Sequence, residues 1–368
     1  MSYAAEIALV LVLVAVAAAC ALPGVFLVLR RMALVSDAIG HVLLFGIVLA
    51  YFATRDIDSP WLLVAAAATG VVTVALVELL QRTRLVKEDA AVGLVFPALF
   101  AGGVLLASMF LRDTHLDVDS VLLGRPEYAT TPRWRALGLD ITPAWVVVAV
   151  LVMNVGLLLL FFKELKLTTF DPGLAAALGF RPGRFHYALM TVVSLTAVAA
   201  FDAVGPVLVV GFFVVPAAAA YLLTDRLGVM LALAALIGAI GAGVGTWAAF
   251  DRDTNIAGTV AVALGGLFAL AFVAAPGRGL VAQLLLRRRQ ARAFHETMLA
   301  VHLLHHENTP EEADEARVDG LHRHLRWAAG DVAGVVRRAE RHGLVTHAGP
   351  LLKLTDAGRQ RAREVLNL

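Results

Sequence analysis

The chain has 368 residues, of which 60% are hydrophobic and 16% are charged, and its mean hydropathy is +0.79. This composition excludes an ordinary soluble domain and is typical of a protein that crosses a membrane several times. The formal net charge of +2 gives no indication of a partner. Because Cys20 is the only cysteine, a disulfide framework and a cysteine-based zinc site are excluded, so any metal site must use His, Asp or Glu.

Apolar runs long enough to cross about 30 Å of hydrocarbon, at about 1.5 Å per residue, recur along most of the chain. They predict nine spans, at residues 7–29, 34–52, 61–80, 91–111, 144–162, 187–204, 207–224, 229–250 and 256–275. The boundary at Gly205 and Pro206 is the least well marked, since these residues can divide an apolar run into halves, and counts of eight and ten stay open. We expect residues 1–286 to form an all-α polytopic membrane domain.

Lysine and arginine near the ends of the predicted spans indicate the orientation, because cytoplasmic loops carry an excess of these residues. Fourteen of them flank one side of the membrane and six flank the other. The side with fourteen is therefore expected to be cytoplasmic. The amino terminus would then lie outside and the carboxyl terminus inside.

Two polar residues, Asp37 and His41, interrupt the second predicted span. Four residues apart on a helix, they share one face, with Cβ atoms about 5 to 6 Å apart. A carboxylate inside a membrane helix costs about 2.5 to 3.5 kcal/mol on insertion scales, so it usually faces protein or a water-filled path. The pair suits a divalent cation, and two pairs facing the axis of a two-fold dimer would offer four ligands. The alternative is an Asp–His hydrogen bond that only locks the helix.

The predicted external loops also carry carboxylates and a histidine. His115 and Asp117 are candidate metal ligands there, and the neighbouring acidic residues would raise the local concentration of divalent cations. Ordinary solvated loop polarity is the alternative, and we favour it.

A short capped helix is predicted between the fifth and sixth spans. Asp171 suits the N-cap, Pro172 the first helical position and Gly179 the position after the C-cap, which leaves about two turns. So short a helix is marginal in water by itself. Because Leu174 and Leu178 share a face, we expect docking onto another protein or another part of this chain. A tight loop packed on the membrane domain is the alternative.

Five segments, in this order, carry a family resemblance, and they read RRMALVSDAIGH (30–41), KEDAAVGLVF (87–96), LDVDSVLLG (116–124), KELKLTTFDPGLAAALG (163–179) and AVGPVLVVGFFVVPAAAAYLL (203–223). Through them the chain resembles, over about residues 5–280, the integral-membrane permeases of bacterial ATP-driven importers for zinc, manganese and iron. The resemblance implies a homodimer on two ATPase subunits in the bacterial cytoplasmic membrane, supplied by an extracytoplasmic metal-binding protein. It implies no permanently bound cofactor and no catalytic site, and the sequence lacks a G-x-x-x-x-G-K-[ST] phosphate loop.

The resemblance further implies that residues 172–178 are the coupling helix, which enters a groove of the ATPase. The residues expected at this contact are Phe170, Asp171, Pro172, Leu174, Ala175, Leu178 and Gly179. The chain departs from the family at Asp202, where we expect a neutral polar residue such as Gln. Asp202 could place another carboxylate near the metal path, but we favour a capping or interfacial role because a helix end is predicted close by.

After Arg287, Arg288 and Arg289 the composition becomes polar, and eight of the 11 histidines lie in this part of the chain. A helix at residues 327–343, a hairpin at 344–354 and a closing helix at 355–366 are predicted. This order resembles a winged helix of the iron-dependent-repressor type. We therefore expect residues 287–368 to form a separate, cytoplasmic α+β domain.

Winged helices often bind DNA, but residues 287–368 carry 14 Lys and Arg against 11 Asp and Glu, and four of the cations adjoin the membrane. This balance does not indicate a phosphate-neutralising face, so we favour a regulatory or protein-interaction role. The histidines His302, His305 and His306 could sense metal, or could be ordinary packing and surface residues.

Three functional classes compete, of which a permease powered by a partner ATPase is favoured. A gradient-driven secondary metal transporter could use the same Asp37 and His41 but would leave the capped helix without a role. A membrane-tethered metal-responsive regulator would not need nine spans. One carboxylate and one imidazole suit manganese, zinc or ferrous iron, and we favour manganese or zinc.

Overall fold

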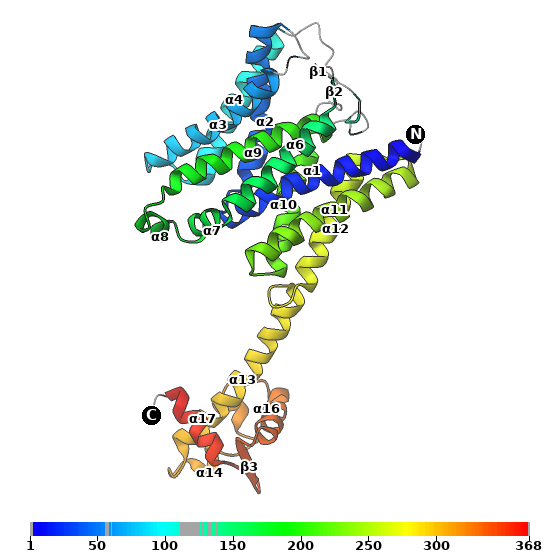
Figure 1. Ribbon diagram of the computed structural model, residues 1–368. Helices are drawn as coiled ribbons and strands as arrows, with labels where there is room; N and C mark the ends of the chain where they lie inside the picture. The colour runs from blue at the N-terminus through cyan, green and yellow to red at the C-terminus, as the bar shows by residue number, and fades with distance from the viewer. Residues whose placement is uncertain are drawn as a thin grey trace. The chain divides into compact units, whose positions relative to one another are not determined.

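The computed structural model describes residues 3–55, 59, 61–110, 126, 129–131, 134–136 and 139–366. The chain divides into two compact units, Met1–Gly279 and Leu280–Leu368, named unit 1 and unit 2 below (Figure 1). Each has a hydrophobic core of its own, so each can be considered by itself.

Unit 1 is built of long apolar helices. Within the described residues, nine are long and apolar enough to cross a membrane, in agreement with the prediction. They are α1 (Tyr3–Leu29), α2 (Ala33–Thr54), α3 (Trp61–Arg82), α4 (Glu88–Phe110), α6 (Pro143–Leu160), α9 (Pro182–Val204), α10 (Pro206–Leu223), α11 (Leu227–Arg252) and α12 (Ile256–Ala274). Shorter elements join them: β1 (Trp134–Ala136) pairs antiparallel with β2 (Leu139–Ile141), and α7 (Phe162–Phe170) and α8 (Pro172–Ala177) lie between α6 and α9.

The first helix, α1, organises the core of unit 1. It packs against α6, α9, α10 and α11 (Figure 1), and its buried side chains include Leu13, Val16 and Phe26. A Cβ at Gly24 would collide with the backbone carbonyl oxygen of Phe213 on α10. Glycine at this position therefore allows the two backbones to approach closely, which is how helices gain van der Waals contact in lipid.

The uncertain boundary near Asp202 is a true break between two helices. Gly205 has φ +82° and ψ 164°, a conformation that is essentially restricted to glycine, and Pro206 occupies the first turn of α10. Because proline lacks an N–H and fixes φ, it starts a helix readily but cannot continue one. The prediction of two separate spans here is confirmed.

Unit 2 is a small helical unit with a single two-stranded sheet among its described residues. Its elements are α13 (Leu280–His306), α14 (Glu312–Glu315), α15 (Leu321–His324), α16 (Ala329–Arg341), β3 (Val345–Ala348), β4 (Leu351–Leu354) and α17 (Asp356–Leu366). The strands pair antiparallel, with Val345 opposite Leu354. The helix, hairpin and closing helix follow one another as the sequence predicts, and Leu299, Val335 and Leu352 are among the residues that fill the core.

Candidate functional site

Asp37 and His41 are the fifth and ninth residues of α2, about 6 and 12 Å from its start at about 1.5 Å per residue. The Oδ1 atom of Asp37 lies 3.4 Å from Nε2 of His41, so the two side chains share a face as predicted. The Asp37 side chain is 47% exposed and that of His41 is 34% exposed. In a membrane segment, such an exposed carboxylate must meet water, an ion or another protein chain rather than lipid.

The imidazole of His41 is held from one side by two aromatic rings of α4. Its ring centroid lies 5.4 Å from that of Phe96 and 5.7 Å from that of Phe100. Close packing of the helices supports this contact, since a Cβ at Gly103 of α4 would lie 2.9 Å from the backbone nitrogen of Phe45 on α2. The apolar contact orients the ring, and the carboxylate of Asp37 is the more exposed of the two side chains.

Of the three weaker candidates, Asp202 alone lies within the described residues. Asp202 is partly buried in the last turn of α9, two residues before the helix ends at Val204. His115 and Asp117 lie outside the described residues.

The predicted short helix is present as α8 and has both predicted caps. The Asp171 carboxylate accepts a hydrogen bond of 2.8 Å from the backbone N–H of Leu174, and Pro172 occupies the first turn. At the other end, Gly179 has φ +86° and donates to the carbonyl oxygen of Ala176, while Phe180 donates to that of Ala175. These two bonds form a Schellman motif, which satisfies carbonyls that the helix end would leave unpaired.

Apolar side chains surround α8 on its open side. Leu174 and Leu178 are 48% and 61% exposed, and Phe170 and Phe180 are exposed as well. Ala175, in contrast, is fully buried, so its role is to seat α8 on the rest of unit 1 rather than to contact a partner. Exposed apolar groups on a short, rigidly capped element are typical of an interaction site.

A contact that the sequence does not indicate ties this region to the start of α2. The Arg30 guanidinium donates hydrogen bonds of 3.1 and 3.2 Å to the hydroxyl of Thr169 and one of 3.3 Å to that of Thr168, both in the last turns of α7. Burial lowers the pKa of Arg30 from its usual value. Its charge is therefore partly desolvated, and the hydroxyl acceptors compensate for the lost water.

A small cavity of about 230 Å³ lies beside the same end of α2. Its charged and titratable lining residues are Arg30, Glu78 of α3 and His186 of α9, and Val35 and Ala38 form its α2 wall. The positive charge of the Arg30 guanidinium would repel a bound cation, so this cavity is poorly suited to a metal ion. Sequence reasoning missed this grouping because the three polar residues come from distant segments.

The model of the ABC 3 transport family matches residues 3–275 of this chain. The chain belongs to the ABC 3 transport family. It is 45% identical over 350 residues to the zinc transport system membrane protein TroD of Treponema pallidum (strain Nichols), covering 95% of each chain. It is 44% identical over 270 residues to the manganese transport system membrane protein MntD of Bacillus subtilis (strain 168), covering 73% of this chain and 91% of MntD.

The fold of this ABC 3 family member also has a counterpart of known structure. A chain of PsaBC from Streptococcus pneumoniae in complex with Fab matches with a TM-score of 0.61 and 25% identity, over 73% of this chain and 91% of that one. The match to TroD is longer than unit 1 and therefore extends into unit 2. Unit 2 thus has a counterpart in at least one relative.

Proposed function

We propose that this chain is the membrane permease subunit of an ATP-driven importer of divalent transition-metal ions, with zinc or manganese as cargo and iron as a further candidate. Its relatives are named as zinc and manganese transport system membrane proteins, which supports this substrate class. The capped helix α8, with its exposed Leu174 and Leu178, is the observation that carries the proposal. A gradient-driven transporter would have no use for it.

The proposal includes three partners. An ATPase subunit would receive α8, because this chain has no phosphate loop of its own. An extracytoplasmic binding protein would deliver the ion. A second copy of the chain would face Asp37 and His41, since the exposed carboxylate needs a polar neighbour within the membrane. Two-fold symmetry would then provide two carboxylates and two imidazoles, with waters completing the coordination of the ion.

Within this assembly, Asp37 and His41 would hold the ion only briefly. Two ligands from each chain, one of them half exposed, suit an ion that must be released, since conduction requires binding weak enough for the ion to leave. Capture at low concentration would be the task of the binding protein. Unit 2 would be a winged-helix-like regulatory or interaction module on the cytoplasmic side, a location that the distribution of Lys and Arg supports.

Replacing both Leu174 and Leu178 with Glu tests the assignment of α8. In proteoliposomes that contain this chain, its ATPase and its binding protein, L174E/L178E should lose ATP-driven uptake, because two charges would replace the apolar contact. The matched control is V365E/L366E on α17 of unit 2, which changes two comparably exposed apolar residues that do not belong to α8 and should leave uptake intact. Normal coupled uptake in L174E/L178E would refute the assignment, and uptake without the ATPase would favour a secondary transporter.

A further inference from the structure

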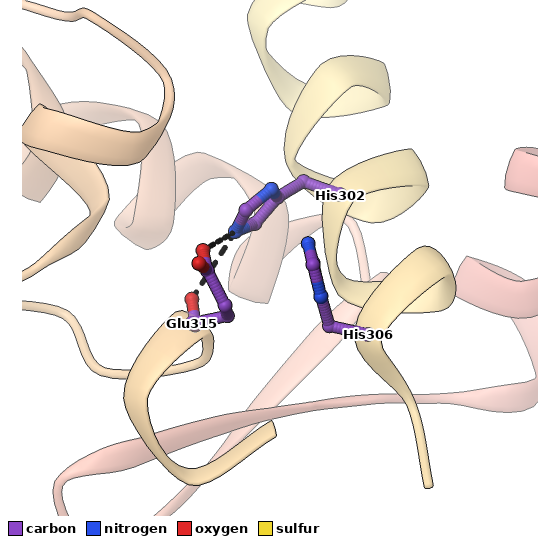
Figure 2. A group of neighbouring side chains, drawn as sticks. All are labelled: His302, His306 and Glu315. Atoms are coloured by element: carbon purple, nitrogen blue, oxygen red, sulfur yellow. Dashed lines mark hydrogen bonds and ion pairs between the residues drawn. The ribbon is translucent and has the colours of Figure 1, made fainter. Parts of the chain in front are cut away.

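A second group of metal-ligating side chains lies far from α2 in the sequence, within unit 2. His302 and His306 are one helical turn apart on α13, and Glu315 comes from α14. One ligand atom from each residue lies within 4.8 Å of the other two. Figure 2 shows that both imidazoles and the carboxylate converge on one gap between the two elements.

The distances within the group are close to those of a coordinated ion. Nε2 of His302 lies 3.3 Å from Oε2 of Glu315. Bonds of about 2.0 to 2.2 Å from zinc to nitrogen and oxygen place tetrahedral ligands about 3.3 to 3.6 Å apart. The imidazole rings of His302 and His306 are already neighbours, with centroids 5.0 Å apart. Nε2 of His302 also lies 3.2 Å from the backbone carbonyl oxygen of Glu315, so coordination of an ion by Nε2 would replace this contact.

Outer contacts orient these ligands. Nδ1 of His324, on α15, lies 2.7 Å from Oε2 of Glu315, and Oε2 of Glu311 lies 3.9 Å from Nδ1 of His306. Carboxylate–imidazole contacts at hydrogen-bond distance, such as that between His324 and Glu315, orient the groups around a metal.

The backbone that carries the ligands is held by the core of unit 2. Leu303 follows His302 directly and is buried, and Ala316 follows Glu315 and is buried as well. Between the two elements, the N–H of Asn308 donates a hydrogen bond of 2.8 Å to Oε2 of Glu312, which closes the turn. The three ligands thus project from supported elements, as precise coordination requires.

We propose that His302, His306 and Glu315 bind one divalent transition-metal ion of the zinc class, with a water molecule completing a tetrahedral shell. Two imidazoles with one carboxylate suit zinc better than manganese, which prefers oxygen ligands. The affinity order of divalent ions favours zinc in the same direction. The site shares no residue with the pair on α2 and does not depend on the proposed import function. If that function holds, the site gives unit 2 a means to register the concentration of the ion.

Zinc stoichiometry of the full-length chain tests this site. The chain, purified without a polyhistidine tag and freed of metal by a chelator, would carry D37N and H41A so that the transport pair cannot contribute. Equilibrium dialysis against zinc, followed by elemental analysis, should give one tightly bound ion per chain. H306A and E315Q should each lose that ion. His305, exposed beside His306, provides the matched control, and H305A should retain the ion.

Cobalt provides a second readout that is independent of stoichiometry. Cobalt in the proposed site should give the intense visible absorption of tetrahedral coordination, and E315Q, which preserves the size of the side chain, should lose it. No bound zinc in the D37N/H41A chain, or equal binding by H305A, H306A and E315Q, would overturn the proposal. A negative result in these binding experiments would not contradict the importer proposal, because that proposal is tested by metal uptake and does not require this site.

Discussion

The pair on α2 and the group on α13 and α14 use the same side-chain chemistry in different surroundings. Asp37 and His41 are two candidate ligands on one helix, and the carboxylate is half exposed. His302, His306 and Glu315 are three candidate ligands on two elements, and outer carboxylate and imidazole groups contact two of them. If both proposals hold, the number of ligands and their outer support, rather than residue type, separate a site suited to release from one suited to retention.

The largest expected effect is the loss of metal uptake when Asp37 or His41 on α2 is substituted. D37N removes the carboxylate of the pair and H41A removes its imidazole, so each variant should reduce metal uptake to background. Both should still assemble with the ATPase and hydrolyse ATP, because α8, the proposed contact with the ATPase, is unchanged in both variants. Radioactive or fluorescent metal uptake in proteoliposomes, with ATP hydrolysis measured in parallel, provides the check.

The matched control for D37N is D253N. Asp253 is exposed just after α11 with φ 50°, a left-handed conformation that Asn also tolerates, so the exchange removes a charge without strain. D253N should transport normally. Uptake retained in the D37N/H41A double variant at normal expression would show that the pair is structural.

Much of unit 1 could be predicted from the sequence because the signals are local. Hydrophobic runs mark the spans, and Asp171, Pro172 and Gly179 mark α8 because a cap acts within one turn. Contacts between distant segments carry no such signal. Arg30 meets Thr169 across 139 residues, and Glu315 joins His302 only because of the turn after α13. The i, i+4 spacing of His302 and His306 is visible in the sequence, but the nearness of Glu315 to them is not.

Removal of residues 293–368 tests whether unit 1 folds and imports metal without unit 2. The truncated chain should still fold, assemble and import metal within about twofold of the full chain, because the core of unit 1 is complete without unit 2. It should bind one zinc ion fewer than the full chain. Uptake and elemental analysis on the same preparation provide the check. Loss of uptake in a truncated chain that assembles normally would show that the two regions are not independent.

The smallest effect is expected at a third combination of carboxylate and imidazole, where we predict a change in stability but not in metal binding. Glu296 of α13 is 8% exposed at its side chain, and its two oxygens contact Nε of Arg338 at 3.3 Å and Nδ1 of His342 at 2.7 Å. The guanidinium cannot be a metal ligand, since it has no acceptor and stays protonated. This arrangement is therefore a structural one, which joins α13 to α16 and its C-cap, His342.

E296Q should lower the stability of unit 2 by about 1 to 2 kcal/mol, because the buried contact loses its charge and one acceptor. The number of zinc ions bound should not change. Hydrogen exchange of α13 and α16 peptides in the full-length chain measures the local opening free energy. The control is E364Q, which removes the charge of an exposed pair with Arg361 on α17. It should change the opening free energy by less than about 0.5 kcal/mol. Loss of zinc in E296Q with unchanged hydrogen exchange would mean that Glu296 is a metal ligand. Contact with an arginine would then not distinguish a structural carboxylate in unit 2 from one that binds metal.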